Sequence, residues 1–226
     1  AWQRGVTGYP IVDAGMRELL ETGWMCQSVR MVVASFLVEY LRCNWVEGEK
    51  WFFENLVDAD SAINAMMWQN AGRSGIDQWN FILSPENASQ DPTGEYTRLW
   101  CPELAKLSNK YLHMPWKAPE NMLLAAGVEL GVVYPHRIVV DLAAERAMGV
   151  EAVLCARRAN QHSNDKSGYD LIQLPGGDTT RLFTKQDFRI DSNGICLPPP
   201  PRTSSRGAGT RGGSRGAGAG ARGGGA

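Results

Sequence analysis

Apolar residues recur at helical spacing along most of the chain. Between residues 25 and 41 they follow one another at steps of three, four and one, which predicts an amphipathic helix. These positions are Met25, Val29, Val32, Val33, Phe36, Leu37, Tyr40 and Leu41. An earlier helix is expected to begin near Pro10, a residue favoured in a first helical turn, and to end before Gly23. Further helices are expected over 47–57, after Asp58, and over 95–107, 119–126 and 141–158.

The chain is expected to have three parts. Residues 1–158 hold all eight tryptophans and almost no alternation of apolar and polar positions, so we predict an all-α domain there. Residues 159–197 form a polar, weakly structured extension whose two short apolar stretches, 169–174 and 181–190, are enough for a weak hairpin. Residues 198–226 are a Pro, Gly, Ala and Arg tail, expected to be disordered because it has too little apolar surface to offset its ordering entropy.

The composition limits the classes of function. With 43% hydrophobic and 21% charged residues, the 226-residue chain resembles a soluble globular protein, and it has no apolar run long enough to span a membrane. Residues 1–4 lack a signal segment and an initiator methionine, so a fragment or a processed chain is expected. The 23 basic residues fall to 18, against 24 acidic ones, when the five tail arginines are left out. So acidic a body is a poor non-specific binder of nucleic acid.

Cysteine and histidine usage gives no sign of a metal. The five cysteines (Cys26, Cys43, Cys101, Cys155 and Cys196) form an odd set without a C-x-x-C pair. This argues against a zinc site and a disulfide framework, and fits a reducing intracellular compartment, whether nucleus, cytoplasm or organelle. The three histidines lie far apart without ligand spacing, so no metal site is predicted.

A polar stripe is predicted on the helix that follows Asp58. Asp60, Asn64 and Trp68 are spaced at i, i+4 and i+8, which puts a carboxylate, an amide and an indole on one helical face. Such a set would suit a bound heteroaromatic ligand, because buried polar groups need partners. The pattern alone leaves a second interpretation open, a solvated helix face with a tryptophan at its edge.

Two further features have alternative interpretations. Arg30 lies in the most apolar helix, where a buried guanidinium needs a carboxylate such as Asp58 or Asp60, whereas an arginine at the helix edge would extend to water. The eight tryptophans among the first 116 residues form either a bulky core or a chain of indoles for electron transfer. Composition does not separate these possibilities.

Several motifs, in this order, resemble those of the photolyase/cryptochrome superfamily. They are TGYPIVDAGMREL (7–19), TGWM (22–25), NWVEG (44–48), DAD (58–60), GEY (94–96), WCPEL (100–104), YLHMPWKAP (111–119) and YP (134–135). The first reproduces the family signature T-G-x-P-x-x-D-A-x-M-R-x-L in full. The resemblance covers about residues 1–147 and implies the C-terminal part of the helical FAD-binding domain. The family's N-terminal antenna domain and the segment that holds the flavin phosphates would lie upstream, so the antenna pigment stays unknown.

The resemblance also implies roles for individual residues near the flavin. Asp58, Ala59 and Asp60 match the segment that contacts FAD, and Arg30 matches the arginine paired with its first aspartate. Asn64 matches the position facing flavin N5, where asparagine is typical of photolyases. Trp68 and Trp45 match the proximal and middle members of the electron-transfer triad, whose distal member would lie upstream of Ala1. The resemblance therefore favours the ligand-binding interpretation of the stripe.

The chain departs from the family where photolyases bind the DNA lesion. Photolyases of cyclobutane dimers read W-M-H-N-R-x-R-M, and this chain reads WMCQSVRM over 24–31. Met31 is retained, but Cys26, Gln27 and Ser28 replace the histidine, the lesion-binding asparagine and the DNA-contacting arginine. Asn70 replaces the lesion-stacking tryptophan. A flipped lesion would lose a stacking platform and a phosphate contact.

Three functions follow from these observations. The first is a cryptochrome-like, FAD-binding photoreceptor in which Trp68 and Trp45 reduce the photoexcited flavin, with a signalling protein as partner. The second is a light-driven DNA photolyase that acts on flipped pyrimidine lesions, which leaves enzymatic activity open. The third is a binding module that contacts nucleic acid or a protein through its Gly/Arg tail. Retained flavin contacts and altered lesion contacts favour the first.

Overall fold

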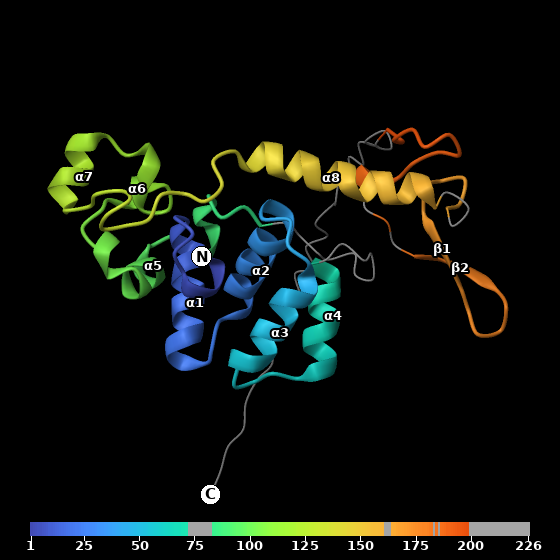
Figure 1. The fold of residues 1–226 in the computed structure, drawn as a ribbon, viewed down its shortest axis with the longest axis horizontal. Coiled ribbons are helices and arrows are strands. Elements are labelled where there is room, and N and C mark those ends of the chain that lie inside the picture. Colours follow the sequence, from blue (N-terminus) through green and yellow to red (C-terminus); the bar gives the residue numbers. More distant parts are fainter. Residues whose placement is uncertain (72–82, 161–163, 183, 185, 199–226) are drawn as a thin grey trace, which may run out of the picture.

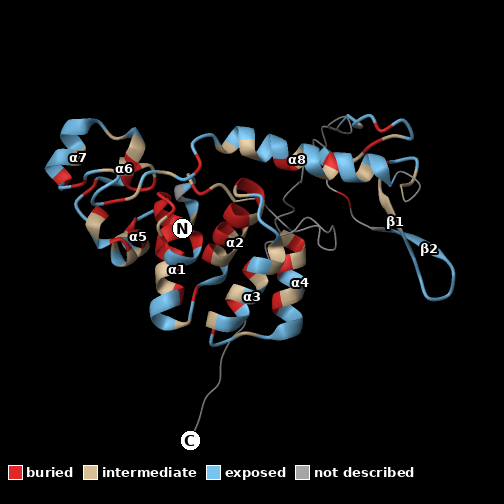
Figure 2. Cartoon of the chain, in the orientation of Figure 1, coloured by how far each residue is buried: buried red, intermediate tan, exposed pale blue. Residues whose placement is uncertain are grey.

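The computed structural model describes residues 1–71, 83–160, 164–182, 184 and 186–198. In the N-terminal part, four helices surround one apolar core (Figure 1). They are α1 (Pro10–Thr22), α2 (Gln27–Ser35), α3 (Trp45–Asn55) and α4 (Ser61–Ala71). Figure 2 shows buried residues concentrated on α1 and α2 and on the inner sides of α3 and α4. The described part of the chain is largely helical.

The expected helix around Pro10 is present because its ends are well specified. Pro10 is the first residue of α1, and Gly23 ends the helix in a left-handed conformation with φ 70°. The expected helix over 25–41 differs in detail. It begins at Gln27, and after Ser35 it continues as a π-helix over Phe36–Tyr40, closed by a hydrogen bond from Leu41 N to Phe36 O. This wider turn leaves the apolar side chains on the buried side of the helix.

A second cluster of helical segments packs on the other side of α1. It contains α5 (Glu95–Trp100), α6 (Asn109–Leu112) and α7 (Glu120–Ala126), around buried residues such as Leu104 and Tyr134. The expectation of one helix over 95–107 was wrong. α5 ends at Trp100, and a short 3-10 helix starts at Pro102, because proline lacks the N–H and restricts the residue before it.

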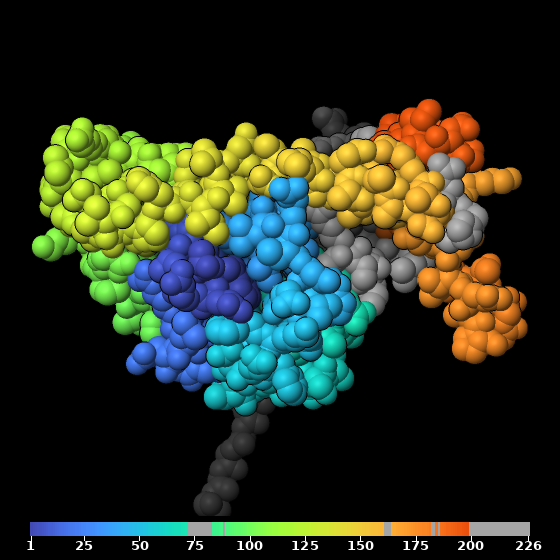
Figure 3. Space-filling model, in the orientation of Figure 1, coloured from blue at the N-terminus to red at the C-terminus, as the bar shows by residue number. Residues whose placement is uncertain are grey.

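The C-terminal part consists of a long helix and a small hairpin. α8 (Leu142–Ala159) lies across one end of the helical core and contacts the π-helix (Figure 3). β1 (Asp170–Gln173) and β2 (Thr179–Leu182) pair antiparallel, and they are the strands among the described residues. Arg157 ties the hairpin to α8, since its Nη1 lies 2.9 Å from the carboxylate of Asp170. The boundaries at 158 and 197 stay predictions.

Two further expectations from the sequence concern membrane-spanning helices and the C-terminal tail. Among the helices that the structure describes, none is long and apolar enough to cross a membrane. The tail predicted to be disordered, apart from Pro198, lies outside the described residues.

Candidate functional site

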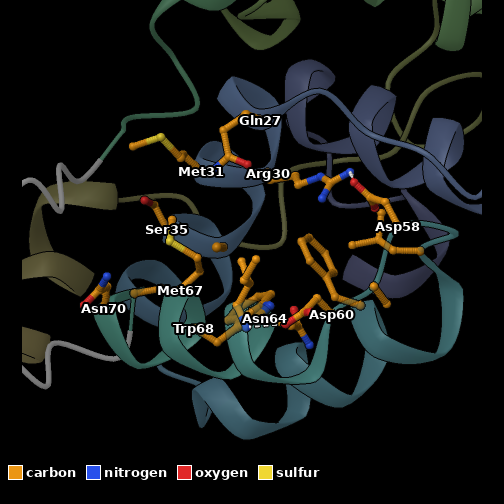
Figure 4. Close-up of a pocket in the computed structure, with 16 residues that line it drawn as sticks. Gln27, Arg30, Met31, Ser35, Asp58, Asp60, Asn64, Met67, Trp68 and Asn70 are labelled. Carbon is orange, nitrogen blue, oxygen red and sulfur yellow. Dashed lines mark hydrogen bonds and ion pairs between the residues drawn. The ribbon is translucent and has the colours of Figure 1, made fainter. Parts of the chain in front are cut away.

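A cavity of about 310 Å³ lies between α2, the end of α3, residues 56–60 and α4 (Figure 4). Nine of the eleven site residues predicted from the sequence line it: Gln27, Arg30, Met31, Asp58, Ala59, Asp60, Asn64, Trp68 and Asn70. Ser28 and Trp45 do not line it. The cavity thus joins two sequence regions separated by about thirty residues, one on α2 and one on and before α4.

Arg30 and Asp58 form an ion pair at one end of the cavity. Arg30 Nη2 lies 3.0 and 2.9 Å from the two carboxylate oxygens of Asp58, and Arg30 Nε donates to Met25 O at 2.7 Å. Of the two interpretations of Arg30, the paired one is therefore present. The side chains of Arg30 and Asp58 are 18% and 38% exposed, so the pair is less buried than the apolar helix suggested. A partly exposed ion pair contributes little to the free energy of folding, but it holds the two side chains in place.

Asp60 caps the helix that carries the rest of the predicted stripe. Its Oδ1 accepts a hydrogen bond from Ile63 N at 2.8 Å, and its backbone oxygen accepts one from Asn64 N. Asp60 therefore precedes α4 instead of standing on its face. Its carboxylate is exposed, at the same end of the cavity as Arg30 and Asp58 (Figure 4). We call Arg30, Asp58 and Asp60 the charged end.

Asn64 is held with its amide nitrogen turned toward the protein. The residue is 9% exposed, and its Nδ2 donates to Glu49 O at 2.9 Å and lies 3.5 Å from Glu49 Oε1. Among the described residues no hydrogen bond uses its Oδ1. The backbone of α3 thus fixes which side of the amide is available to a ligand.

Trp68 is 2% exposed and packs edge-on against two other aromatic rings. The ring centroid of Phe52 lies 5.0 Å away and that of Trp2 6.3 Å away, both nearly perpendicular. Gly48 gives the indole its space, because a Cβ at that position would lie 2.2 Å from Trp68 Cη2. The solvated-face interpretation of the stripe is therefore wrong for Asn64 and Trp68, which are both buried.

Among the described residues, the side chains at the opposite end of the cavity carry no charge. This end is formed by Gln27, Met31, Ser35, Met67 and Asn70, which we call the neutral end (Figure 4). The Gln27 side chain is exposed and makes no hydrogen bond among the described residues, whereas Asn70 is buried. Ser35 Oγ accepts a hydrogen bond from Leu83 N at 3.4 Å.

Ser28 and Trp45 lie away from the cavity. Ser28 lies beside Cys26, with 3.4 Å between its Oγ and the cysteine sulfur. Trp45 is the first residue of α3 and packs, half-buried, against the main apolar core. Among the described residues no ring contact joins it to Trp68.

The sequence missed seven residues that line the cavity: Ala34, Ser35, Phe52, Leu56, Ile63, Met67 and Ala71. Helical spacing offered one usable signal, because Ala34 follows Gln27 and Arg30 at steps of three and four on α2. Phe52 and Leu56 gave none, since apolar residues of a core and of a cavity wall look alike in a sequence. No group of three or more His, Cys, Asp or Glu side chains in the described ranges could hold a metal ion.

Comparison with known proteins connects this geometry with one family. The model of the FAD binding domain of DNA photolyase matches residues 1–153. Deoxyribodipyrimidine photo-lyase of Agrobacterium fabrum is 50% identical over 159 residues, which cover 68% of this chain and 33% of that protein. Cryptochrome-1 of Arabidopsis thaliana is 48% identical over 143 residues, covering 62% of this chain and 21% of that protein.

Solved structures show the same relationship. A bacterial class III photolyase from Agrobacterium tumefaciens aligns with a TM-score of 0.65 and 45% identity, over 70% of this chain and 33% of that one. The chain spans about a third or less of the length of these relatives. The matches include both photolyases and a cryptochrome, so similarity alone does not choose between repair and signalling.

Proposed function

The chain belongs to the family of the FAD binding domain of DNA photolyase, and from this premise we propose that it is the flavin-binding part of a cryptochrome-like blue-light receptor. Trp68 and Trp45 are its electron donors in this proposal. The observation that carries it is the cavity, whose charged end includes the predicted flavin-contacting residues and whose neutral end has only uncharged side chains among the described residues.

The cofactor of this domain is FAD, and the residues around the cavity fit it. Arg30, Asp58 and Asp60 offer charged partners for polar groups, and the free Oδ1 of Asn64 offers an acceptor. The alanines and apolar side chains of the lining leave room for a flat ring. Bound FAD supplies the absorption of blue light and the exchange of single electrons.

The surroundings of Trp68 support its role as electron donor. Its indole lines the cavity directly and is shielded from water by Phe52 and Trp2. Trp45 belongs to the adjacent helix, which packs against α4. An electron lost by Trp68 would be replaced from Trp45 in this proposal.

The neutral end supports a receptor more than a repair enzyme. Repair requires a base flipped out of the duplex, and unstacking costs a few kcal/mol that contacts in the pocket must recover. Gln27 and Asn70 offer hydrogen bonds but little stacking area, and Ser28 adds no charge. Photolyase activity is the second candidate function. It is favoured by Asn64, the residue typical of photolyases at its position, with its amide held by Glu49.

A third candidate, binding of nucleic acid or a protein through the tail, concerns residues outside the described part. It predicts a salt-dependent affinity that disappears when residues 198–226 are removed. A reducing intracellular compartment remains part of the proposal, and the five cysteines, all free thiols, support it.

Absorption spectra before and after blue light test the proposed function. The purified protein is expected to show a flavin spectrum that bleaches on illumination. Trp68→Phe preserves the aromatic shape but is harder to oxidise, so it should slow or abolish bleaching while the flavin stays bound. Trp100→Phe, which removes an indole from the cluster on the other side of α1, is the control and should bleach normally. Unchanged kinetics in Trp68→Phe would exclude Trp68 as donor.

A further inference from the structure

A second cavity, of about 270 Å³, is lined by Gly8, which precedes α1, by Pro115 and Trp116, and by the segment between α7 and α8. Figure 1 shows this segment passing the end of α1 on its way to α8. Two buried hydrogen bonds fix this segment: Tyr134 Oη donates to Asp13 at 2.6 Å, and Tyr9 Oη donates to Val139 O at 2.9 Å. Residues far apart in the sequence therefore form a rigid frame around the cavity.

At Gly8 the two backbone segments come so close together that no side chain fits between them. The φ of Gly8 is +80°, and a Cβ there would lie 2.6 Å from Arg137 N and from the backbone of His136. The crossing is therefore a contact between two backbones. The positions of His136 and Arg137 are fixed by this contact before any ligand binds.

Arg137 gives the cavity a positive charge. Its guanidinium carbon lies 4.4 Å from the centre of the Trp116 ring, and its Nη1 donates to Val140 O at 3.0 Å. The guanidinium also interacts with the hydroxyl of Tyr9. Burial raises the pKa of Tyr9, and the interaction with Arg137 partly offsets this rise. Among the described residues no carboxylate lies within 4.0 Å of the guanidinium. An arginine has five N–H donors, so several remain for a ligand.

Among the described residues, the rest of the lining contributes the rings of Trp116 and His136 and no carboxylate. The Trp116 ring borders the cavity, while its Nε1 is buried. His136 adds an exposed imidazole. The carboxylate of Glu86, which raises the pKa of Tyr9, lies 3.7 Å from Lys117 Nζ.

We propose that this cavity binds the oxyanion of a small ligand, a carboxylate or a phosphate, with Arg137, which lies over the Trp116 ring, as its counter-ion. The other walls are apolar, formed by Pro115, Leu130, Pro135 and Val140. They admit a compact apolar body next to the oxyanion. This site is separate from the flavin cavity, and none of its residues lines both.

NMR of the indole N–H groups in the full 226-residue chain tests the proposal. The Trp116 signal is assigned with Trp116→Phe, and the protein is titrated with inorganic phosphate and with butyrate at constant ionic strength. A saturable shift of the Trp116 signal is expected. Butyrate alone would identify a carboxylate ligand with an apolar body, and phosphate alone a phosphate ligand. Both results support the oxyanion site.

Variants separate this site from general attraction of anions. Arg137→Gln should weaken binding about tenfold or more, because it removes a charged hydrogen bond. If that variant does not fold, Arg137→Lys keeps the charge but loses the planar donor set, and it should also bind more weakly. Arg4→Gln removes an exposed charge outside the cavity and should bind normally. No saturable shift with either anion, or equal losses in Arg4→Gln and the Arg137 variant, would overturn the proposal.

Discussion

The two ends of the flavin cavity differ in how firmly their polar groups are held. At the charged end, Arg30 donates hydrogen bonds to the backbone oxygen of Met25 and to both carboxylate oxygens of Asp58. The carboxylate of Asp60 caps α4. At the neutral end, Asn70 is buried and Ser35 accepts a hydrogen bond from Leu83 N. The Gln27 side chain there is exposed without a hydrogen bond among the described residues, and Met67 is a flexible thioether. The charged end is preorganised by the fold, and the neutral end only in part.

This difference separates two kinds of recognition in one cavity. Groups held in place by backbone bonds or opposite charges bind a ligand without an added ordering cost, which suits a resident cofactor. Side chains without such bonds, such as that of Gln27, must be ordered when a ligand binds, which weakens binding. The charged end therefore suits the retention of FAD, and in our proposal the neutral end binds a DNA lesion only weakly. The following predictions test this contrast.

The largest expected effect concerns repair of cyclobutane pyrimidine dimers. We expect repair by the reduced protein under blue light to be at least about tenfold slower than by the photo-lyase of Agrobacterium fabrum. The missing aromatic platform alone corresponds to about 1–3 kcal/mol. The assay measures intact bases recovered from a dimer-containing oligonucleotide, with both flavins matched in amount and redox state.

A charge-restoring variant sharpens this test. Ser28→Arg should strengthen DNA binding at low salt and steepen the salt dependence by about one phosphate contact, a slope change of about 0.9. Efficient repair by the unchanged protein would contradict the contrast between the two ends and promote the photolyase function.

Gly48→Ala should have the next largest effect, on the wall beside Trp68. The added methyl would lie 2.2 Å from Trp68 Cη2, so the indole or α3 must move. Overpacking of this kind costs about 1–3 kcal/mol, and flavin binding should fall because Trp68 lines the cavity. Chemical denaturation measures the free energy of unfolding. Gly176→Ala, with open space around its Cβ, is the control and should stay within about 0.5 kcal/mol of the parent.

The sequence predicted helices best where local signals mark their ends. Pro10 and Gly23 bound α1, and Asp141 accepts a backbone hydrogen bond at the start of α8. The helix expected over 47–57 instead begins at Trp45, after its cap Asn44, and ends at Asn55. The π-helix over Phe36–Tyr40 was not predicted, because one additional residue in a turn hardly changes the apolar spacing. The break at Pro102 was overlooked although the proline indicated it.

The site could be predicted only in part, for a physical reason. Periodicity can place Gln27, Arg30 and Met31 on one helix and Asn64 and Trp68 on another. It does not show that these faces meet, because that depends on packing between α2 and α4. The bond from Asn64 to the backbone of Glu49 is likewise invisible in the sequence, since any residue has a carbonyl oxygen.

A smaller effect is expected for Asp60, which has two separable roles. Asp60→Ala removes the cap of α4 and should lower the free energy of unfolding by about 1 kcal/mol. Asp60→Asn keeps an acceptor for Ile63 N and should change stability by only a few tenths of a kcal/mol. Both variants should lose flavin if the carboxylate contacts the cofactor. Full flavin content in Asp60→Asn would restrict Asp60 to its capping role.

The smallest effect on stability is expected for Arg30→Gln, although this residue anchors the charged end. Because the Asp58 side chain is 38% exposed, water can solvate the carboxylate once its partner is gone. We expect a loss of about 1 kcal/mol or less in the free energy of unfolding, smaller than a deeply buried pair would give. Flavin content after purification should nevertheless fall, because Asp58 and the adjoining loop lose the bond that positions them.

A second ion pair, away from the cavity, is the control that separates the positioning of Asp58 from a general loss of stability. Arg42→Gln breaks the 2.8 Å ion pair with Glu145, whose members are 45% and 28% exposed, away from the cavity. It should cost a similar amount of stability and leave flavin content unchanged. If both variants lost flavin equally, the loss would follow from weakened folding, and the charged end would have no special role. If Arg30→Gln alone lost flavin, a partly exposed pair of small energetic value would still determine whether the cavity holds flavin.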